Sequence, residues 1–408
     1  MLLFYVLGIK FYSALIYFAS FFNDKAKLWI NGRKNWRKKF NVNAKTRKIW
    51  FHFASLGEFE QGKPLLQAVK NQYPEKEIII TFFSPSGFEI RKNSPLGDYI
   101  LYLPIDSRSN AKDFIELFKP EIAVFNKYEY WYFYFEKLNE KQIPLYVTSA
   151  IFRPKQIFFK FYGGFNRKIL NLVTHFFVQN EESIKLLETI GLQNSTLSGD
   201  TRFDSVLNLV KNRKEFPEID QFKGESGLFI AGSTWPEDEN FIANYIDKQP
   251  FNWNFIIAPH EISETKLLTL EKAINVKSIR YSKLIKARFT DAKVLIIDNI
   301  GMLSSLYAYG EIAFIGGGFG IGIHNTLEAS AWRLPVIFGP NYDKFQEAKD
   351  LLELQGGFTV ANQNELNIII NQLMSSEDYR KQSGEIAKNY VSKNTGATAI
   401  IMKHIFNF

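Results

Sequence analysis

The chain has 408 residues, more than one hydrophobic core usually supports, so two domains are expected. Its 46% hydrophobic and 23% charged residues exclude a disordered chain, and the absence of cysteine excludes disulfides, thiolate metal sites and cysteine nucleophiles. The net charge of +8 would suit a nucleic-acid binder only if it were spread over the body of the protein.

The positive charge is concentrated near the N-terminus instead. Residues 23–48 contain ten lysines or arginines and one acid, Asp24, whereas the rest of the chain is close to neutral. A basic stretch directly after an apolar one is typical of a segment that adheres to anionic lipid. The sequence therefore predicts a basic membrane-proximal segment at 23–48, an anionic membrane surface as partner, and no nucleic-acid partner.

The preceding residues, 1–22, predict a membrane-anchor helix. At ~1.5 Å per residue the helix would be about 33 Å long, just enough to cross a bilayer core. Its polar residues fall on one stripe, which favours a helix lying in the membrane interface over a full span; they are Lys10, Ser13, Tyr17 and Ser20. Because basic residues follow the anchor, the positive-inside tendency places the body at the cytoplasmic face. The alternative is a buried N-terminal helix with a solvated basic face.

Beyond residue 48, short β-rich apolar runs alternate with longer amphipathic runs, the pattern of a parallel sheet covered by helices. The expected strands of a first series are Trp50–Ala54, Ile78–Phe83, Ile122–Phe125, Leu145–Thr148 and Phe176–Val178. Those of a second series are Leu228–Ala231, Phe255–Ala258, Val294–Asp298, Ile312–Ile315 and Val336–Phe338. The sequence thus predicts an α/β protein with two doubly wound, Rossmann-like domains.

The domain boundaries follow from this alternation. We expect domains at 49–205 and 227–385 that face each other across a cleft, joined by a polar linker at 206–226. The last residues, 386–408, predict a helix that packs back on the body or on the membrane. In doubly wound sheets, ligands bind beyond the carboxyl ends of the strands, so the loops there are expected to hold the site.

The glycine-rich stretch after Ile312–Ile315 predicts a phosphate site. Glycines let the backbone approach a phosphate closely, and amides at the start of the following helix point at it. The stretch contains Gly316, Gly317 and Gly318, and then His324, Asn325 and Glu328. Asn325 and Glu328 also fit a plain capping box, which needs no ligand.

The residues after the first strand are ambiguous in the same way. Ser55 and Glu58 have capping-box spacing, so the start of a helix explains them without any catalysis. Glu58 would nevertheless lie at the carboxyl end of a strand, where a carboxylate can take a proton from an incoming hydroxyl. The pattern alone leaves both interpretations open.

Eight short blocks occur in an order and at intervals that are more specific than any block alone. They are the N-terminal anchor, Ala54–Glu58, Ser84–Gly87, Leu103–Asp106, Tyr128–Trp131, Gly199–Asp204, Ala231–Thr234 and Gly316–Pro340. Together they resemble, nearly from end to end, the Kdo (3-deoxy-D-manno-oct-2-ulosonic acid) transferases of lipopolysaccharide synthesis. The resemblance implies a GT-B fold and transfer of Kdo from CMP-Kdo to a lipid A precursor, with inversion at the anomeric carbon and without a metal or other cofactor. Its expected location is the cytoplasmic face of the inner membrane.

The same resemblance assigns site residues. Glu58 would be the general base for the acceptor hydroxyl. The donor-binding residues would be Ser233, Thr234, His260, Gly316, Gly317, Gly318, His324, Asn325 and Glu328. Contacts to the Kdo carboxylate or the acceptor would come from Ser55, Gly57, Ser84, Glu129, Arg153 and Arg202. This chemistry is reasonable because amides can stabilise a departing phosphate in place of a divalent ion, and an arginine can clamp a carboxylate.

Two blocks depart from the family pattern. The family has an arginine between proline and histidine where this chain reads Pro259-His260, and an acid and a proline where it reads Lys127 and Tyr132. The five histidines show no metal-ligand spacing, so no metal site is expected.

Two other functions remain open from the sequence. One is a different sugar-nucleotide enzyme of the same fold, such as a UDP-sugar transferase or an epimerase. The other is a non-enzymatic membrane scaffold or nucleic-acid binder, which would show salt-dependent affinity for polyanions and no turnover.

Overall fold

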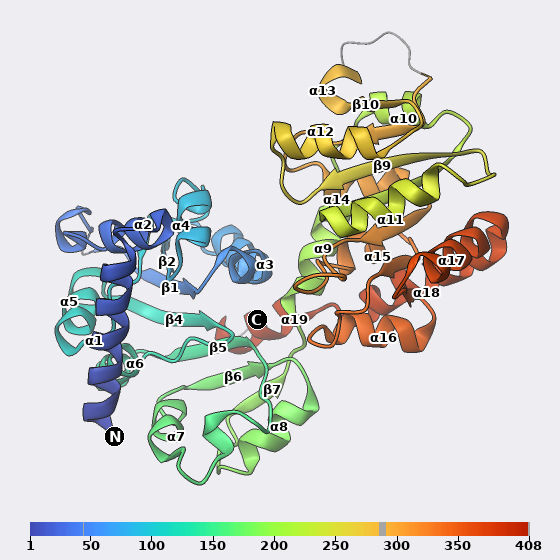
Figure 1. The fold of residues 1–408 in the computed structure, drawn as a ribbon. Coiled ribbons are helices and arrows are strands. Elements are labelled where there is room, and N and C mark those ends of the chain that lie inside the picture. Colours follow the sequence, from blue (N-terminus) through green and yellow to red (C-terminus); the bar gives the residue numbers. More distant parts are fainter. Residues whose placement is uncertain (44, 285–290, 407–408) are drawn as a thin grey trace. The chain divides into compact units, whose positions relative to one another are not determined.

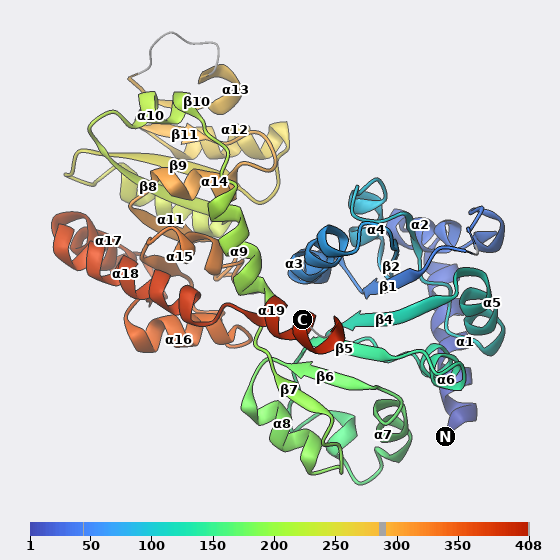
Figure 2. The same cartoon turned by 180° about the vertical axis from the view of Figure 1, so that it is seen from behind.

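The computed structural model describes residues 1–43, 45–284 and 291–406, and the chain divides into two compact units. Unit 1 consists of Met1–Ser205 and Thr395–Phe408, and unit 2 of Val206–Asn394. Each unit is built on its own seven-stranded parallel sheet (Figures 1 and 2). The prediction of two doubly wound domains is confirmed.

The sheet of unit 1 has the order β3-β2-β1-β4-β5-β6-β7. Its strands are β1 Lys48–Phe53, β2 Glu77–Phe82, β3 Tyr99–Tyr102, β4 Pro120–Asn126, β5 Leu145–Ala150, β6 His175–Val178 and β7 Ser195–Leu197. The five predicted strands are present, and the two unpredicted ones, β3 and β7, lie at the two edges. From β1 the chain adds strands toward one edge, β2 and then β3, and it then returns to add β4 to β7 toward the other edge. The order of strands therefore reverses between β1 and β4.

Helices cover both faces of this sheet. One core lies under α5, α6, α7 and α8, and the other lies under α3 and the C-terminal α19. The helices of unit 1 are α1 Leu2–Ala19, α2 Asp24–Gly32, α3 Leu56–Gln72, α4 Pro85–Arg91, α5 Arg108–Phe118, α6 Tyr132–Glu140, α7 Gly164–Leu170, α8 Glu181–Glu188, α9 Thr201–Lys211 and α19 Ala397–Phe406, with short 3-10 turns at η1 Trp36–Lys38 and η2 Ile157–Phe159. Helix α9 begins in unit 1 and ends in unit 2.

The sheet of unit 2 has the order β10-β11-β9-β8-β12-β13-β14. Its strands are β8 Gly227–Thr234, β9 Trp253–Pro259, β10 Ser278–Arg280, β11 Val294–Ile296, β12 Ile312–Ile315, β13 Val336–Phe338 and β14 Gly357–Thr359. The two strands that the sequence did not predict, β10 and β14, are again the edges. Here the order in which strands are added reverses between β8 and β12.

Helices cover both faces of this sheet too. Helices α11, α12 and α17 lie over one core, and the others contribute to the second core. The helices of unit 2 are α10 Pro217–Lys223, α11 Pro236–Ile246, α12 Glu264–Ala273, α13 Tyr281–Leu284, α14 Leu303–Leu306, α15 Leu327–Ala331, α16 Gln346–Leu354, α17 Gln363–Ser375 and α18 Glu377–Lys393, with a 3-10 turn at η3 Tyr307–Tyr309. Residues 206–226, expected as a linker, hold the end of α9 and helix α10, whose Ile219 and Phe222 are buried in this core.

The C-terminal residues form two helices rather than one. Gly396, with φ +109°, interrupts the chain between α18 and α19, a conformation that side chains rarely adopt. Asp204 accepts hydrogen bonds from the backbone N–H groups of Gly396 and Thr398, both at 2.7 Å. Ile401 and Met402 of α19 then pack into the core of unit 1.

Helix α1 is long and apolar enough to cross a membrane, by length and composition alone, and none of its residues is buried. The alternative of a buried N-terminal helix is therefore wrong. One side of the helix packs against unit 1, where the hydroxyl of Tyr5 donates a 2.6 Å hydrogen bond to Asp106. The other side is exposed and apolar, with Phe4 and Phe11 at 71% and 66% exposure. The polar stripe does not form one exposed face, because Ser13 lies on the packed side.

Candidate active site

The first group of site residues lies where β1 and β4 end in unit 1. Glu58 follows β1 in the first turn of α3, and Glu129 follows β4. The strands are neighbours and parallel, so their carboxyl ends meet at one edge of the sheet. This is the topological switch point of unit 1, the usual place for a ligand in a doubly wound sheet.

The carboxylate of Glu58 is held at the end of its own strand. Its Oε2 accepts a 2.6 Å hydrogen bond from the backbone N–H of Ala54. The side chain of Ser55, which precedes α3, makes no capping hydrogen bond, so the reciprocal capping box is not formed. Burial, together with the negative charge of Glu129, raises the pKa of Glu58 to about 7. A carboxylate with such a pKa is suited to general-base catalysis near neutral pH.

Glu129 is fixed by two ring nitrogens. Its Oε2 accepts a 3.0 Å hydrogen bond from Nε1 of Trp131 and lies 2.9 Å from Nε2 of His52. His52 is fully buried in β1, and its Nδ1 lies 2.8 Å from the hydroxyl of Thr81, which also accepts from Nε1 of Trp50. In the tautomer with the proton on Nε2, His52 donates a hydrogen bond to Glu129 and accepts one from Thr81 at Nδ1.

Cationic side chains surround these two acids. The hydroxyl of Tyr128 interacts with Arg153 and, through charge alone, with Glu58 and Arg202. Arg202 is anchored by Asp200, with 2.8 Å between Nε and Oδ2. Burial alone would raise the pKa of Asp200, but Arg202 and the nearby Lys127 hold it below its usual value. The site thus combines a carboxylate of raised pKa with fixed positive charge.

Three other predicted contact residues lie at the ends of β1 and β2. Ser84 precedes α4, and its backbone N–H donates a 2.8 Å hydrogen bond to the carbonyl of Ala54. The hydroxyl of Ser84 pairs with that of Ser86 at 2.7 Å. Gly57 is exposed and Ser55 half-buried. Their contact with a substrate stays a prediction.

The second group of site residues lies at the switch point of unit 2, where β8 and β12 end. Ser233 has φ +55°, in the left-handed region, and the buried Thr234 donates a 3.1 Å hydrogen bond to Glu239. The N–H of Gly316 donates to the carbonyl of Gly232 at 2.9 Å, and that of Gly317 donates to Asp238 at 2.8 Å. These two amides are therefore occupied by protein atoms.

The glycines of this loop allow the close approach of backbones. A Cβ on Gly318 would lie 2.5 Å from the nitrogen of Gly339, and one on Gly316 would lie 2.3 Å from the carbonyl oxygen of Ser233. Gly317 has φ +91° as well. Tight packing accounts for the glycines, and their role in donor binding stays a prediction.

Three aromatic rings stack beside the loop. The ring centroid of His260 lies 4.8 Å from that of Trp235 and 4.4 Å from that of His324. Nε1 of Trp235 donates a 3.1 Å hydrogen bond to Nε2 of His324. Burial and the neighbouring His260 lower the pKa of His324 to about 4, which keeps Nε2 an acceptor at neutral pH.

The start of α15 does not form the predicted capping box, because its N-cap residue is Thr326, whose side chain makes no capping hydrogen bond. Asn325 Oδ1 accepts a 3.0 Å hydrogen bond from the N–H of Leu327, and its Nδ2 donates to Glu328 at 3.1 Å. These contacts explain the residue types without a ligand. Among the described residues, no group of three or more His, Cys, Asp or Glu side chains is placed to hold a metal ion.

Sequence reasoning missed His52, Trp235 and Asp238. Asp238 is buried, and it accepts hydrogen bonds from the N–H groups of both Gly317 and Trp235 at 2.8 Å. In the sequence, these residues could have been found as polar residues within or directly after a predicted strand, such as His52 in the buried run of β1.

Comparison with known proteins places these features in a family context. The family model described as 3-deoxy-D-manno-octulosonic-acid transferase (kdotransferase) matches residues 34–205. The chain is 28% identical to the 3-deoxy-D-manno-octulosonic acid transferase of Aquifex aeolicus, over 85% of this chain and 92% of that protein. It is 27% identical to a bifunctional glycosyltransferase/methyltransferase of Fusobacterium nucleatum, over 96% of this chain and 63% of that protein.

Solved structures share the fold. A UDP-GlcNAc 2-epimerase from Neisseria meningitidis superposes with a TM-score of 0.63 at 17% identity, covering 88% of this chain and all of the other. MurG from Acinetobacter baumannii gives 0.56 at 11% identity, covering 89% and 100%. The GT-B fold and the resemblance to the Kdo transferases are thus confirmed, and the similarity supports a glycosyltransferase.

Proposed function

From this similarity to the Kdo transferases, we propose that the chain transfers Kdo from CMP-Kdo to a lipid A precursor, without a metal and with inversion at the anomeric carbon. The observation that carries the proposal is Glu58, a carboxylate with a pKa of about 7 at the switch point of unit 1. At neutral pH a large fraction of such a group is ionised, and it can accept the proton of a sugar hydroxyl.

The transfer exchanges one bond to the anomeric carbon of Kdo for another. The acceptor hydroxyl oxygen forms a bond to the anomeric carbon of Kdo while its proton passes to a carboxylate oxygen of Glu58. The bond between that carbon and the phosphate oxygen breaks, and CMP leaves with the electron pair. Attack from the face opposite the leaving group inverts the configuration.

We assign the supporting roles by charge. Arg153 and Arg202 both interact with Tyr128 and match the carboxylate of Kdo, which an arginine binds through two parallel hydrogen bonds. We assign donor binding in unit 2 to the loops around Ser233 and Gly318 and to the stack of His260 and His324. The amide of Gly317 is excluded as a phosphate donor in this conformation, because Asp238 already accepts its hydrogen bond.

We place the reaction at the cytoplasmic face of the inner membrane. The exposed apolar side of α1 supports membrane attachment, and the basic residues that follow support contact with anionic lipid. Helix α1 packs on unit 1 through its other side, which favours a helix in the interface over one that spans the bilayer alone.

Nucleotide competition tests the donor class. We expect CMP to compete with CMP-Kdo for the purified chain, and UDP and UDP-GlcNAc to compete at least about tenfold more weakly. Preference for UDP would instead indicate a UDP-sugar enzyme, the other activity found on this fold.

A further inference from the structure

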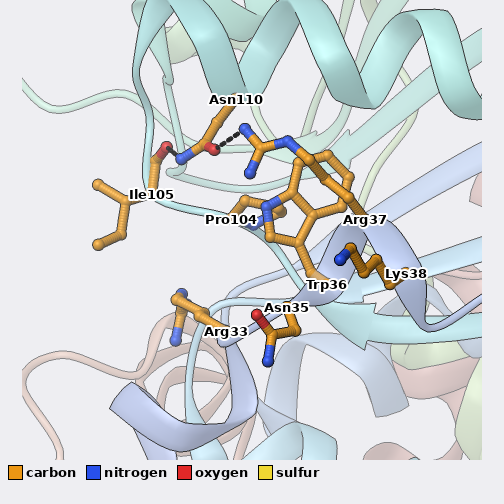
Figure 3. Close-up of a pocket in the computed structure, with 8 residues that line it drawn as sticks. All are labelled: Arg33, Asn35, Trp36, Arg37, Lys38, Pro104, Ile105 and Asn110. Atoms are coloured by element: carbon orange, nitrogen blue, oxygen red, sulfur yellow. Dashed lines mark hydrogen bonds between the residues drawn. The ribbon is translucent and has the colours of Figure 1, made fainter.

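A second candidate site lies in unit 1, in the basic segment. A cavity of about 270 Å³ opens there, and all its charged lining residues are cations (Figure 3). It is lined by Arg33, Asn35, Trp36, Arg37, Lys38, Pro104, Ile105 and Asn110. Among the described residues no acid pairs with Arg33 or Lys38, so the cavity has positive charge that attracts an anion.

Arg33 and Arg37 do not reach out to lipid as the sequence suggested, because protein atoms bind both side chains. Arg33 is 8% exposed and donates to three backbone carbonyls, those of Leu103, Trp29 and Phe83, at 2.7–3.1 Å. Arg37 donates to Asp113 at 2.6 Å, and its guanidinium lies 4.7 Å from the centre of the Trp36 ring. Both guanidinium groups are therefore held in fixed positions; Arg33 has only carbonyl partners, whereas Asp113 offsets the charge of Arg37.

Trp36 supplies an independent observation. Its side chain is 4% exposed, and in the described part of the chain its indole N–H has no hydrogen-bond partner. The indole groups of Trp50 and Trp131, by contrast, donate to Thr81 and Glu129. The N–H is not among the fully enclosed unpaired donors of the described residues, so water or a ligand that enters the cavity can accept its hydrogen bond. Figure 3 shows the indole in the middle of the lining residues.

Two more donors face the same cavity without a partner among the described residues. They are the side-chain amide of Asn35 and the ammonium of Lys38, both on exposed residues. Asn35 has φ +54°, a left-handed conformation that asparagine tolerates better than most residues. With Trp36, the cavity offers an indole, an amide and an ammonium donor, all suited to phosphate oxygens.

The position of the cavity favours one source of phosphate. Pro104 and Ile105 line it and also line a small apolar cavity that Ile9 and Tyr12 of α1 help to form. The cavity therefore lies beside a helix whose other side is apolar and exposed. Lipid headgroups lie at the level of polar groups that flank an interfacial helix, so a lipid phosphate can reach the cavity from the membrane.

We propose that this cavity binds the phosphate group of an anionic membrane phospholipid. Trp36, Asn35 and Lys38 donate the hydrogen bonds, and Arg33 supplies fixed charge. The site recognises phosphate chemistry and goes beyond the general attraction of a basic segment to a negative surface. It is independent of the transfer reaction, and its test needs neither CMP-Kdo nor a lipid A precursor.

The test measures binding of the full chain to two kinds of vesicle with equal surface charge. One contains phosphatidic acid and the other contains a diacylglycerol succinate, which is anionic but has no phosphate. We expect at least about fivefold tighter binding to phosphatidic acid, a preference of about 1 kcal/mol. Equal binding to both vesicles would overturn the proposal.

Variants locate the preference. Trp36→Phe removes the indole N–H and keeps an aromatic ring, and Lys38→Gln changes an exposed residue that cannot disturb the core; each should bring the ratio of the two affinities close to one. The control, Lys34→Gln, removes the same charge from the same segment outside the cavity, and should weaken both affinities alike without changing the ratio. A Lys38→Gln variant that keeps the full preference would contradict the assignment.

A soluble competitor separates the two sources of phosphate. We expect inorganic phosphate at millimolar concentration to leave the preference for phosphatidic acid vesicles intact, because α1 contributes to the binding of a lipid but not of a free ion. Loss of the preference at such concentrations would identify a site for free phosphate and overturn the assignment to a lipid.

Discussion

The carboxylate of Glu58 accepts a 2.6 Å hydrogen bond from the backbone N–H of Ala54, four residues earlier in the chain. The contact holds the acid at the carboxyl end of β1, next to Glu129 and beside the cations of the same unit. A residue that only capped α3 would serve equally well as an amide, whereas a base needs the carboxylate. That difference makes the role of Glu58 testable.

Glu58→Gln should therefore abolish most transfer while leaving nucleotide affinity unchanged. The loss of a general base lowers kcat by about 10²–10⁴-fold. The control is Glu60→Gln in the same helix, because Glu60 pairs with Arg91 instead. Single-turnover rates and CMP affinity measured for both variants separate chemistry from binding. Near-normal turnover by Glu58→Gln would exclude it as the base.

The pH dependence of kcat/KM should report the ionisation of Glu58. The ionised form is the base, so activity should rise with pH through an apparent pKa near 7 and level off above it. Burial is the main cause of the raised pKa and Glu129 adds to it. Glu129→Gln should therefore shift the rise of kcat/KM to lower pH. Lys127→Met should shift it to higher pH, because Lys127 favours the ionised form. If kcat/KM rose at the same pH in the native protein and in both variants, Glu58 would not be the group that titrates.

Asp238 should matter for both stability and donor binding. Asp238→Ala leaves the N–H groups of Gly317 and Trp235 without their acceptor, which costs about 3 kcal/mol for two largely buried donors. The glycine loop should loosen and CMP should bind more weakly. Glu237→Ala, one residue earlier and exposed, is the control. Chemical denaturation and CMP titration of both variants measure the two effects; equal behaviour would show that Asp238 does not hold the loop.

His175 should make unit 1 less stable as the pH falls. Burial, together with the nearby His404, lowers the pKa of His175 from 6.5 to about 4. Between these values the unfolded chain binds a proton that the folded chain does not, so the free energy of unfolding falls as the pH is lowered through this window. Because the residue is partly exposed, solvent screening limits the effect to about 1 kcal/mol. His175→Gln should flatten the fall in Tm between pH 7 and 5; an unchanged slope would exclude His175 as the cause.

Most of the fold could be predicted because its central strands are continuous apolar runs. Strand β1 is buried along its whole length, which requires helices on both faces of the sheet. The missed strands, β3, β7, β10 and β14, are the four edges. They are only three or four residues long, and β7, β10 and β14 carry polar residues or glycine, so no apolar run marks these three. Strand β3, Tyr-Ile-Leu-Tyr, is an apolar run that sequence reasoning overlooked.

The candidate site was only partly predictable for a different reason. The place of Glu58 followed from a strand end and Glu129 was assigned from the family resemblance. The partners that fix such residues come from distant segments, as Thr81 does for His52. Sequence motifs also could not show that Asp238 already occupies the amide of Gly317. Such contacts depend on tertiary packing and have no local pattern.

The most direct test of the account supplies CMP-Kdo and a tetra-acylated, bisphosphorylated lipid A precursor to the purified chain and follows the lipid by mass spectrometry. We predict a mass increase of one or more Kdo residues with the native protein and none with Glu58→Gln over the same time. An unchanged lipid mass with the native protein, while CMP still binds, would contradict the central claim that Glu58 serves a Kdo transfer reaction.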